Sequence, residues 1–366
     1  MARRTAIFLS AVLLSLLIVP VANILSAPNF QAIKWKKTFL YNMDFGSRWL
    51  AKVLYPLGIS TDPKQVIIGR DGWLYLGDEY TQAVSVDRRP PTEAEIKLGQ
   101  QIGAATAAWN AYLSSKGVQL FRILIGPNKG TIYPEHLPTW AKPASPNATD
   151  ALLAGAGTTY YVDPRISLLA AKANHKEPLY YKTDTHWNFL GAGIAFRSFA
   201  QQIGTVARQL RWPLDRAYEV SRVVPRAGGD LARFLRLEAD FAESEPIIYA
   251  LDLPVETTQY DFGTNQVVHR GGNPTVGVQL RPLLISSVGA LNKTKVLWLR
   301  DSVGTVISPL MAATFSEVLQ LDWSEGIKPG GRIIQLVEDW KPNYVFFTVV
   351  ERSSRAEWFA NYPPRY

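Results

Sequence analysis

Two short polar motifs in this sequence carry side chains that could act together as a nucleophile, a base and an orienting acid. Asp184 and His186 are separated by one residue, so the carboxylate can accept the proton of one imidazole nitrogen. The other ring nitrogen is then free to act as a base. Ser302 follows an apolar run, where a sharp turn would project its hydroxyl towards backbone N–H groups that can stabilise an oxyanion. These are the parts of a serine acyl-transfer site, and we expect Ser302, His186 and Asp184 to be catalytic.

Each motif taken alone has a simpler explanation. An isolated Asp-x-His more often caps the following helix or satisfies a buried polar group, because short motifs match frequently by chance. Ser302, or Asp301 before it, could be a helix N-cap, a role that stabilises a helix by about 1 kcal/mol. The catalytic interpretation therefore depends on both motifs meeting in the folded chain.

Three further residues are candidates for binding substrate. Arg352 follows the apolar run 344–350 and could bind a carboxylate or polarise an acyl carbonyl, or it could pair with Glu351. Trp187 could stack on a sugar ring, although packing in the core is the commoner fate of an aromatic side chain. Lys129 could contact substrate or be a solvated loop residue.

Composition excludes several other kinds of site. The 366 residues contain four histidines and no cysteine, which rules out disulfides, cysteine-ligated zinc and a cysteine nucleophile. We expect no metal and no cofactor. The net charge of +8 comes from scattered basic residues with no nucleic-acid motif, so we expect no nucleic-acid partner. An acidic polysaccharide or an anionic membrane surface suits the same charge.

The elements that must position these residues read as an α/β fold. Apolar runs at 118–126, 296–299, 317–321 and 344–350 are separated by helical segments. This order predicts a mostly parallel sheet with helices on both faces, whose site lies at the carboxyl ends of the strands. Residues 205–290 are rich in Pro and Gly with alternating polar pieces, and we interpret them as a possible β-rich insertion.

Local signals place the elements before the first strand of this sheet. Asp71-Gly72 between the apolar pieces 66–68 and 73–76 predicts a hairpin. Thr92 and Glu95 fit a capping box, and Gly117 is placed to end the helix that the box begins.

The pattern of the first 27 residues predicts a membrane helix. Arg3 and Arg4 precede an apolar run over 6–25, long enough to cross a hydrocarbon core of about 30 Å. A cleaved signal peptide and a retained anchor both fit, and small residues at 26–27 resemble a cleavage site. Pro28 suits cleavage poorly, so we favour the anchor.

The anchor divides the chain into three predicted parts: the anchor 1–27, a juxtamembrane segment 28–65 with a short amphipathic helix, and a domain over 66–366. Lys34, Lys36 and Lys37 weaken the positive-inside signal, but the short N-terminal tail makes N-in the simpler orientation. Everything after residue 28 would then lie outside the cytoplasm. We expect a single-pass protein of a bacterial inner membrane with its domain in the periplasm.

Several ordered motifs, spread over about residues 60–355, together resemble the alginate O-acetylation family, AlgX and AlgJ. They are 69–75 (GRDGWLY), 127–129 (PNK), 133–135 (YPE), 184–188 (DTHWN), the 301–302 turn (DS) and 351–352 (ER). The resemblance implies an SGNH-hydrolase-like domain in the permuted order, with Asp and His before Ser. Unlike AlgX, this chain has no cysteine and no obvious carbohydrate-binding module after residue 355, which favours the AlgJ type.

The resemblance also implies an activity and partners. Ser302 would take an acetyl group as an acyl-enzyme and pass it to a hydroxyl of an exopolysaccharide, with His186 and Asp184 completing the triad. A separate membrane-bound O-acyltransferase would supply the acetyl group. A carbohydrate acetyl-esterase with the same triad stays an alternative, as does a non-catalytic scaffold or polysaccharide-binding subunit of a synthase complex.

Overall fold

The computed structural model of the chain describes residues 2–27, 29, 33 and 35–364. The expectations that concern Pro28 and Lys34 fall outside these described residues.

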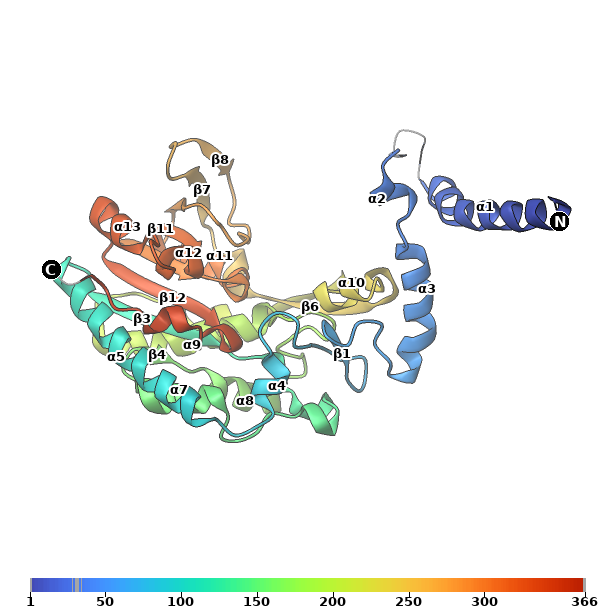
Figure 1. Cartoon of the computed structure of the whole chain (residues 1–366). Helices are drawn as coiled ribbons and strands as arrows, with labels where there is room; N and C mark the ends of the chain where they lie inside the picture. Colours follow the sequence, from blue (N-terminus) through green and yellow to red (C-terminus); the bar gives the residue numbers. More distant parts are fainter. Residues whose placement is uncertain (1, 28, 30–32, 34, 365–366) are drawn as a thin grey trace.

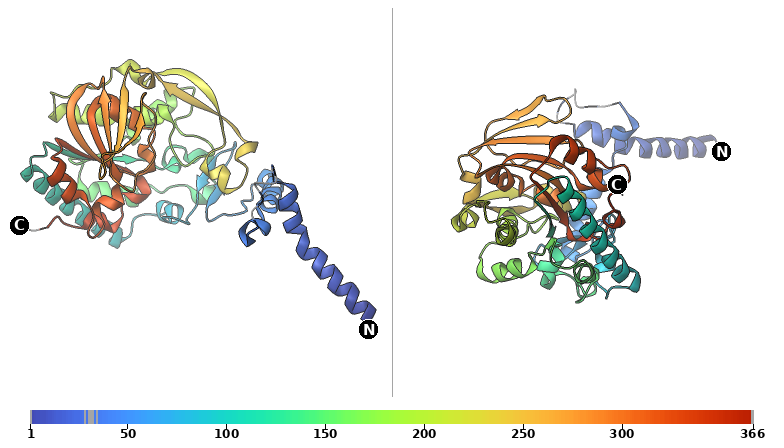
Figure 2. Two further views of the ribbon diagram at one scale, coloured as in Figure 1. Left: turned by 90° about the horizontal axis from the view of Figure 1, so that it is seen from above. Right: turned by 90° about the vertical axis from the view of Figure 1, so that its left-hand side faces the viewer.

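The N-terminal helix α1 (Ala2–Leu25) stands apart from the rest of the molecule (Figure 1). Within Arg3–Leu25, an 18-residue window reaches a mean hydropathy of 2.5, and hardly any of that window is buried. Within the described residues it is the one helix long and apolar enough to cross a membrane. Figure 2 shows it projecting from the body in two further views. The helix is therefore a candidate membrane span, and its retention as an anchor stays a prediction because signal sequences share these features.

The body is built on one eight-stranded sheet with the order β4-β3-β12-β10-β11-β9-β7-β8. In chain order its strands are β3 (Leu120–Gly126), β4 (Tyr161–Val162), β7 (Glu256–Asp261), β8 (Val267–Arg270), β9 (Leu283–Val288), β10 (Asn292–Arg300), β11 (Phe315–Asp322) and β12 (Tyr344–Val350). The pairs from β4 to β11 are parallel, and the pairs from β11 to β8 are antiparallel. The expectation of a mostly parallel sheet is therefore wrong, and the sheet is mixed. The reason is that β7 and β8 are joined by a short reversing loop and β9 returns beside β7, which makes these connections antiparallel.

Helices cover both faces of the sheet. One face packs against α8 (Arg165–Asn174), α9 (Phe189–Val206) and α11 (Ser308–Thr314). The other packs against α5 (Glu93–Ser115), α7 (Ala148–Ala156), α12 (Trp323–Ile327) and α13 (Ile333–Trp340).

Alternation along the strands divides the core between these two layers. In β10, Val296 and Trp298 face the α9 layer while Leu297 and Leu299 face the α5 layer. All four are completely buried, and burying one such aliphatic side chain is worth about 1.5–3 kcal/mol.

The remaining elements form the surroundings of the sheet. A small hairpin pairs β1 (Val66–Ile68) with β2 (Leu74–Leu76), and a second ribbon pairs β5 (Val220–Ala227) with β6 (Ala242–Ile248). The short α-helices are α2 (Lys37–Leu40), α3 (Asp44–Leu54), α4 (Ala83–Asp87), α6 (Lys129–Ile132) and α10 (Asp230–Phe234). The 3₁₀ turns are η2 (Tyr55–Leu57), η3 (Pro134–His136), η4 (Thr139–Ala141), η5 (Asp215–Tyr218), η6 (Glu238–Asp240), η7 (Tyr249–Asp252), η8 (Ser302–Gly304), η9 (Glu351–Ser353) and η10 (Glu357–Ala360).

Two local predictions are confirmed at the level of atoms. Asp71 and Gly72 both have positive φ, as the tight turn between β1 and β2 requires. At the start of α5, Glu95 N donates to Thr92 Oγ1 at 3.3 Å while Thr92 N donates to Glu95 Oε2 at 2.8 Å, so the capping box is formed. The helix ends before Gly117, whose φ is 87°.

The helical segment expected between the apolar runs 296–299 and 317–321 does not begin directly after β10. Residues 302–304 form only the 3₁₀ turn η8, and the α-helix starts later, at Ser308. Pro309 lies in the first turn of α11, a position that proline favours, and the helix begins there.

Candidate active site

Three of the candidate residues follow neighbouring strands at one edge of the sheet. Because β3, β12 and β10 are adjacent and parallel, their carboxyl ends lie side by side. Lys129 follows β3, Arg352 follows β12 and Ser302 follows β10. The sheet thus brings together residues far apart in the sequence, as parallel α/β sheets do at their ligand sites.

The Ser302 turn is held by the side chain of Asp301, which is half-buried. Its Oδ1 accepts from Val303 N at 3.1 Å, and its Oδ2 accepts from Val350 N at 2.8 Å, which ties the end of β10 to the end of β12. Burial raises the pKa of Asp301. Since the Val303 amide is already bonded, it is not available as an oxyanion donor.

His186 is oriented by Asp184 in the way the sequence predicts. His186 Nδ1 lies 2.6 Å from Asp184 Oδ1, and the His186 backbone N–H donates to the same oxygen at 3.1 Å. The other ring nitrogen, Nε2, is buried and has no hydrogen-bond partner within the described residues. The described residues show no hydrogen bond from Nε2 to Ser302, so proton transfer from the serine requires its hydroxyl to approach this free nitrogen.

Charge neighbours set the protonation of this pair. Burial opposes ionisation of Asp184, but its bonds to His186 and Arg226 outweigh burial and hold its pKa well below the ordinary value. Burial alone would lower the pKa of His186, yet the hydrogen bond and charge of Asp184 raise it overall. The imidazolium that forms during proton transfer is therefore stabilised.

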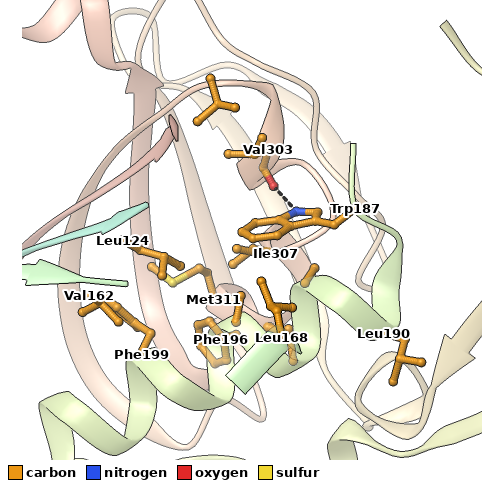
Figure 3. Close-up of a cluster of buried hydrophobic side chains, with 14 of the residues drawn as sticks. Leu124, Val162, Leu168, Trp187, Leu190, Phe196, Phe199, Val303, Ile307 and Met311 are labelled. Atoms are coloured by element: carbon orange, nitrogen blue, oxygen red, sulfur yellow. Dashed lines mark hydrogen bonds between the residues drawn. The ribbon is translucent and has the colours of Figure 1, made fainter. Parts of the chain in front are cut away.

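A buried hydrogen bond joins the histidine loop to the serine turn. Trp187 Nε1 donates to the carbonyl of Val303 at 2.9 Å, so the residue after His186 is bonded to the residue after Ser302 (Figure 3). Trp187 is 1% exposed and packs in the core, so its ring offers no face to a sugar. The structure thus gives Trp187 a positioning role in place of the expected substrate contact.

Lys129 also differs from the expected substrate contact. It is 4% exposed, and its Nζ donates to the carbonyls of Tyr181, Lys182 and Asp184 at 3.0, 2.9 and 2.6 Å. Three acceptors use all three N–H groups of the ammonium form. Burial lowers the pKa of Lys129 to about 7. The side chain fastens the loop that carries Asp184 to the end of β3.

The ribbon β5–β6 and the start of α10 supply residues that the sequence did not point to. Arg226 Nη2 donates to Asp184 Oδ2 at 2.8 Å, and its guanidinium lies 3.7 Å from the centre of the Tyr181 ring. Asp230 accepts from Thr185 N at 2.7 Å and from Thr185 Oγ1 at 2.6 Å. No motif marks Arg226 or Asp230, which lie in the Pro- and Gly-rich segment 205–290.

Asp184, His186 and Asp230 could also be considered as metal ligands, because their ligand atoms lie within 4.8 Å of one another. The surrounding bonds favour a hydrogen-bonded network. Asp184 Oδ2 is already paired with the Arg226 guanidinium, whose positive charge opposes a bound cation. The Thr185 hydroxyl, 3.1 Å from His186 Nδ1, bridges the histidine and Asp230.

A pocket adjoins this network. Its polar lining includes Thr185, Asn128 and Arg352, and its apolar lining includes Val84 and Leu137. Arg352 Nη1 donates to Asn128 Oδ1 at 3.1 Å, and within the described residues no ion pair joins Arg352 to Glu351. Glu351 is completely buried and instead accepts from the Asn128 backbone N–H at 2.7 Å. Arg352 thus lines the pocket, and its guanidinium is bonded to Asn128 and not to Glu351.

The fold and this edge of the sheet define an SGNH-hydrolase-like α/β protein. Residues 66–263, more than half of the chain, match the family model described as "ALGX: SGNH hydrolase-like domain, acetyltransferase AlgX". The chain belongs to this family. The matched range contains Asp184, His186 and Arg226, and it ends before Ser302.

Curated relatives carry the name AlgJ. The chain is 31% identical over 185 residues to the probable alginate O-acetylase AlgJ of Pseudomonas fluorescens and 30% identical over 189 residues to that of Pseudomonas aeruginosa. Each alignment covers 50% of this chain and 44% of the relative. The aligned segment is thus less than half of the length of these relatives.

Solved structures share the fold. Bacillus cereus PatB1 superposes with a TM-score of 0.59 at 16% identity, covering 80% of this chain and 98% of that one. A DHHW family protein from Eubacterium siraeum superposes with a TM-score of 0.55 at 15% identity, covering 84% of this chain and 98% of the other. At these identities the likeness establishes the architecture.

We expect Gly229→Ala to destabilise the site. A Cβ at this position would lie 2.4 Å from both Cβ and Oδ2 of Asp184, so the carboxylate must move away from Arg226. Overpacking of this kind costs about 1–3 kcal/mol, measurable as a lower free energy of unfolding in urea. Gly204→Ala is the matched control, since its Cβ would meet nothing closer than 4.0 Å. Equal stability of the two variants would contradict this account.

Proposed function

We propose that this protein is an O-acetyltransferase that carries an acetyl group on Ser302 and transfers it to a hydroxyl of an exopolysaccharide. The observation that carries the proposal is the state of His186. Its Nδ1 is hydrogen-bonded to Asp184, and its Nε2 is buried and without a partner within the described residues. The next residue, Trp187, is hydrogen-bonded to the Ser302 turn. Membership in the acetyltransferase AlgX family and the similarity to AlgJ support acetyl as the transferred group.

The first half of the reaction forms the acyl-enzyme. Ser302 Oγ attacks the acetyl carbonyl of the donor while His186 Nε2 takes the hydroxyl proton. Asp184 stabilises the resulting imidazolium, and Arg226 keeps Asp184 ionised. The tetrahedral intermediate collapses as His186 returns the proton to the leaving group.

The second half delivers the acetyl group to a sugar. A hydroxyl of the polysaccharide attacks the Ser302 ester, His186 removes its proton, and the serine oxygen leaves with that proton. Arg352, at the pocket next to Thr185, is placed to bind a carboxylate of an acidic polymer. The net charge of +8 favours such an acceptor.

We further propose that α1 is a retained single-pass anchor in a bacterial inner membrane and that the body lies in the periplasm. The basic residues Arg3 and Arg4 before the span support this orientation. Acetyl donors are made in the cytoplasm, so a membrane-bound O-acyltransferase is the partner that we expect to supply the group.

Ser302→Ala and His186→Ala should each lower turnover by several orders of magnitude, because neither half of the reaction proceeds without them. The full chain in detergent is incubated with an activated acetyl ester, and released acetate and acetylated oligosaccharide are measured. Ser198→Ala and His175→Ala are matched controls, since Ser198 bonds within α9 and His175 is exposed.

The products of this assay separate the candidate functions. Acetylated sugar supports the transferase, whereas free acetate alone, in the presence of acceptors, indicates an esterase. A protein that releases nothing, and whose Ser302→Ala variant leaves cellular acetylation unchanged, would be a scaffold.

The pH dependence of kcat/KM should show an acidic limb above the ordinary histidine pKa of 6.5. The base must be neutral, and pairing with Asp184 raises the pKa of His186, so activity is lost as the pH falls through that raised value. Asp184→Asn removes the charge and leaves burial as the main influence on the ring. The limb should then move to lower pH while kcat falls about 10⁴-fold.

Asp252→Asn serves as the control for charge, since Asp252 forms an ion pair with Arg222 outside this network. If the acidic limb of the Asp184→Asn variant stayed at the same pH or moved to higher pH, the result would count against Asp184 as the orienting acid.

Arg352→Met should raise the KM for an acidic oligosaccharide acceptor by roughly ten- to a hundredfold, the loss expected for a hydrogen bond to a charged group. Hydrolysis of a small neutral acetyl ester should be nearly unchanged. Arg216→Met is the control, because Arg216 lies over the ring of Tyr249. If ester hydrolysis fell instead, Arg352 would act on the acyl carbonyl and not on the acceptor.

A further inference from the structure

Helix α3 has two different faces, and one of them is fixed to the body. Ala51 is 2% exposed, and the Tyr55 ring meets Phe241 edge-on with 5.2 Å between centroids. Around this contact lie three ion pairs to the segment after α10: Arg48–Asp240 at 3.1 Å, Lys52–Asp240 at 2.8 Å and Asp44–Arg236 at 2.5 Å. The contacts hold α3 against the body with a defined rotation about its own axis.

The opposite face of α3 is apolar and exposed. We call it the outer face; it consists of Phe45, Trp49, Leu50, Val53 and, in the following 3₁₀ turn, Leu57. Each of these side chains is at least 44% exposed. At about 100° per residue these positions fall on one side of a helix, about half a turn away from Ala51 and Tyr55.

The outer face is fixed relative to the end of the candidate membrane span. Asn23, in the last turn of α1, donates from Nδ2 to the carbonyls of Leu40 and Asn42 at 2.9 and 2.8 Å. Asn42 lies two residues before α3. Figures 1 and 2 show α3 between the body and α1, with α1 running away on the far side. The outer face is therefore directed to the side on which α1 enters a bilayer.

Aromatic and basic residues near this junction suit a lipid headgroup region. Trp35, Tyr41 and Met43, in the stretch of chain before α3, are exposed. Lys36 and Lys37 are exposed next to them. Tryptophan and tyrosine favour the membrane interface, and lysines next to a span are attracted to anionic lipids.

We propose that α3 lies in the plane of the membrane surface, with its outer face inserted among the lipids of the leaflet from which α1 emerges. The body would then be seated on the bilayer and not suspended from a flexible tether. The proposal depends on α1 being a span, and it does not depend on the acetyl-transfer chemistry.

The contacts that hold α3 against the body also connect α3 to the candidate active site. The segment that receives α3 begins with α10, whose first residue, Asp230, binds Thr185 next to His186. Leu231 and Ala232 of α10 donate their backbone N–H groups to the Thr183 carbonyl. Binding of α3 to the bilayer would therefore hold the histidine loop at a constant height above the membrane surface.

The absence of cysteine allows a direct test. Val53→Cys on the outer face and Val268→Cys on β8 replace exposed valines, and each is labelled with a nitroxide in the full chain. β8 lies far from α3 in Figure 1. The proteins are reconstituted in vesicles of phosphatidylethanolamine and phosphatidylglycerol. Relaxation of the nitroxide by oxygen, which concentrates in lipid, is compared with relaxation by a water-soluble nickel chelate.

We expect oxygen to relax the label at position 53 severalfold more than the label at position 268. The nickel chelate should relax the label at position 53 less than the label at position 268. A label at 53 that nickel reaches as readily as the control would overturn the proposal. So would a label shielded from both reagents, because the outer face would then be covered by protein. Labels at Leu50→Cys repeat the measurement independently, and thermal unfolding of every variant checks that it is folded.

Discussion

The arrangement of the site depends on one buried hydrogen bond, between the indole of Trp187 and the carbonyl of Val303. It joins the loop before α9 to the turn after β10. No strand pairing connects these two segments. Leaving a buried donor or acceptor unpaired costs about 1–3 kcal/mol, so this bond keeps the two segments in a fixed position relative to each other. Gly126 fits closely below this contact: a Cβ there would lie 3.0 Å from Val303 and 3.2 Å from Trp187.

Around this contact, buried and half-buried polar groups are paired one after another. Arg226 binds Asp184, Asp184 binds His186, and Thr185 links the histidine to Asp230. Buried ionised groups are tolerated only when they are bonded in this way. Lys129 adds a cation below the loop, where it is bonded to three backbone carbonyls. Within the described residues, His186 Nε2 is the one buried side-chain nitrogen of this network without a partner, and the proposed mechanism assigns the proton transfer to this atom.

The sequence predicted those parts of the structure that local chemistry determines. The capping box at Thr92, the turn at Asp71 and the buried strands β3, β10 and β12 follow from short-range patterns. The mixed sheet was missed because β7 to β9 are short and partly exposed, so their apolar periodicity is weak. Arg226 could not be predicted, since its role arises only when the β5–β6 ribbon folds over residues 181–184. The burial of Lys129 and Trp187 likewise depends on tertiary packing, which no spacing rule encodes.

The position of β12 in the sheet has a consequence for how the protein is made. Leu120 of β3 pairs with Tyr344 of β12, and β12 also separates β3 from β10. The middle of the sheet therefore cannot close until residues 344–350 have been synthesised. Contacts so distant along the chain are slow to form. A nascent chain that exposes the histidine loop still lacks the serine turn in place, so a partly made protein would have no reactive nucleophile.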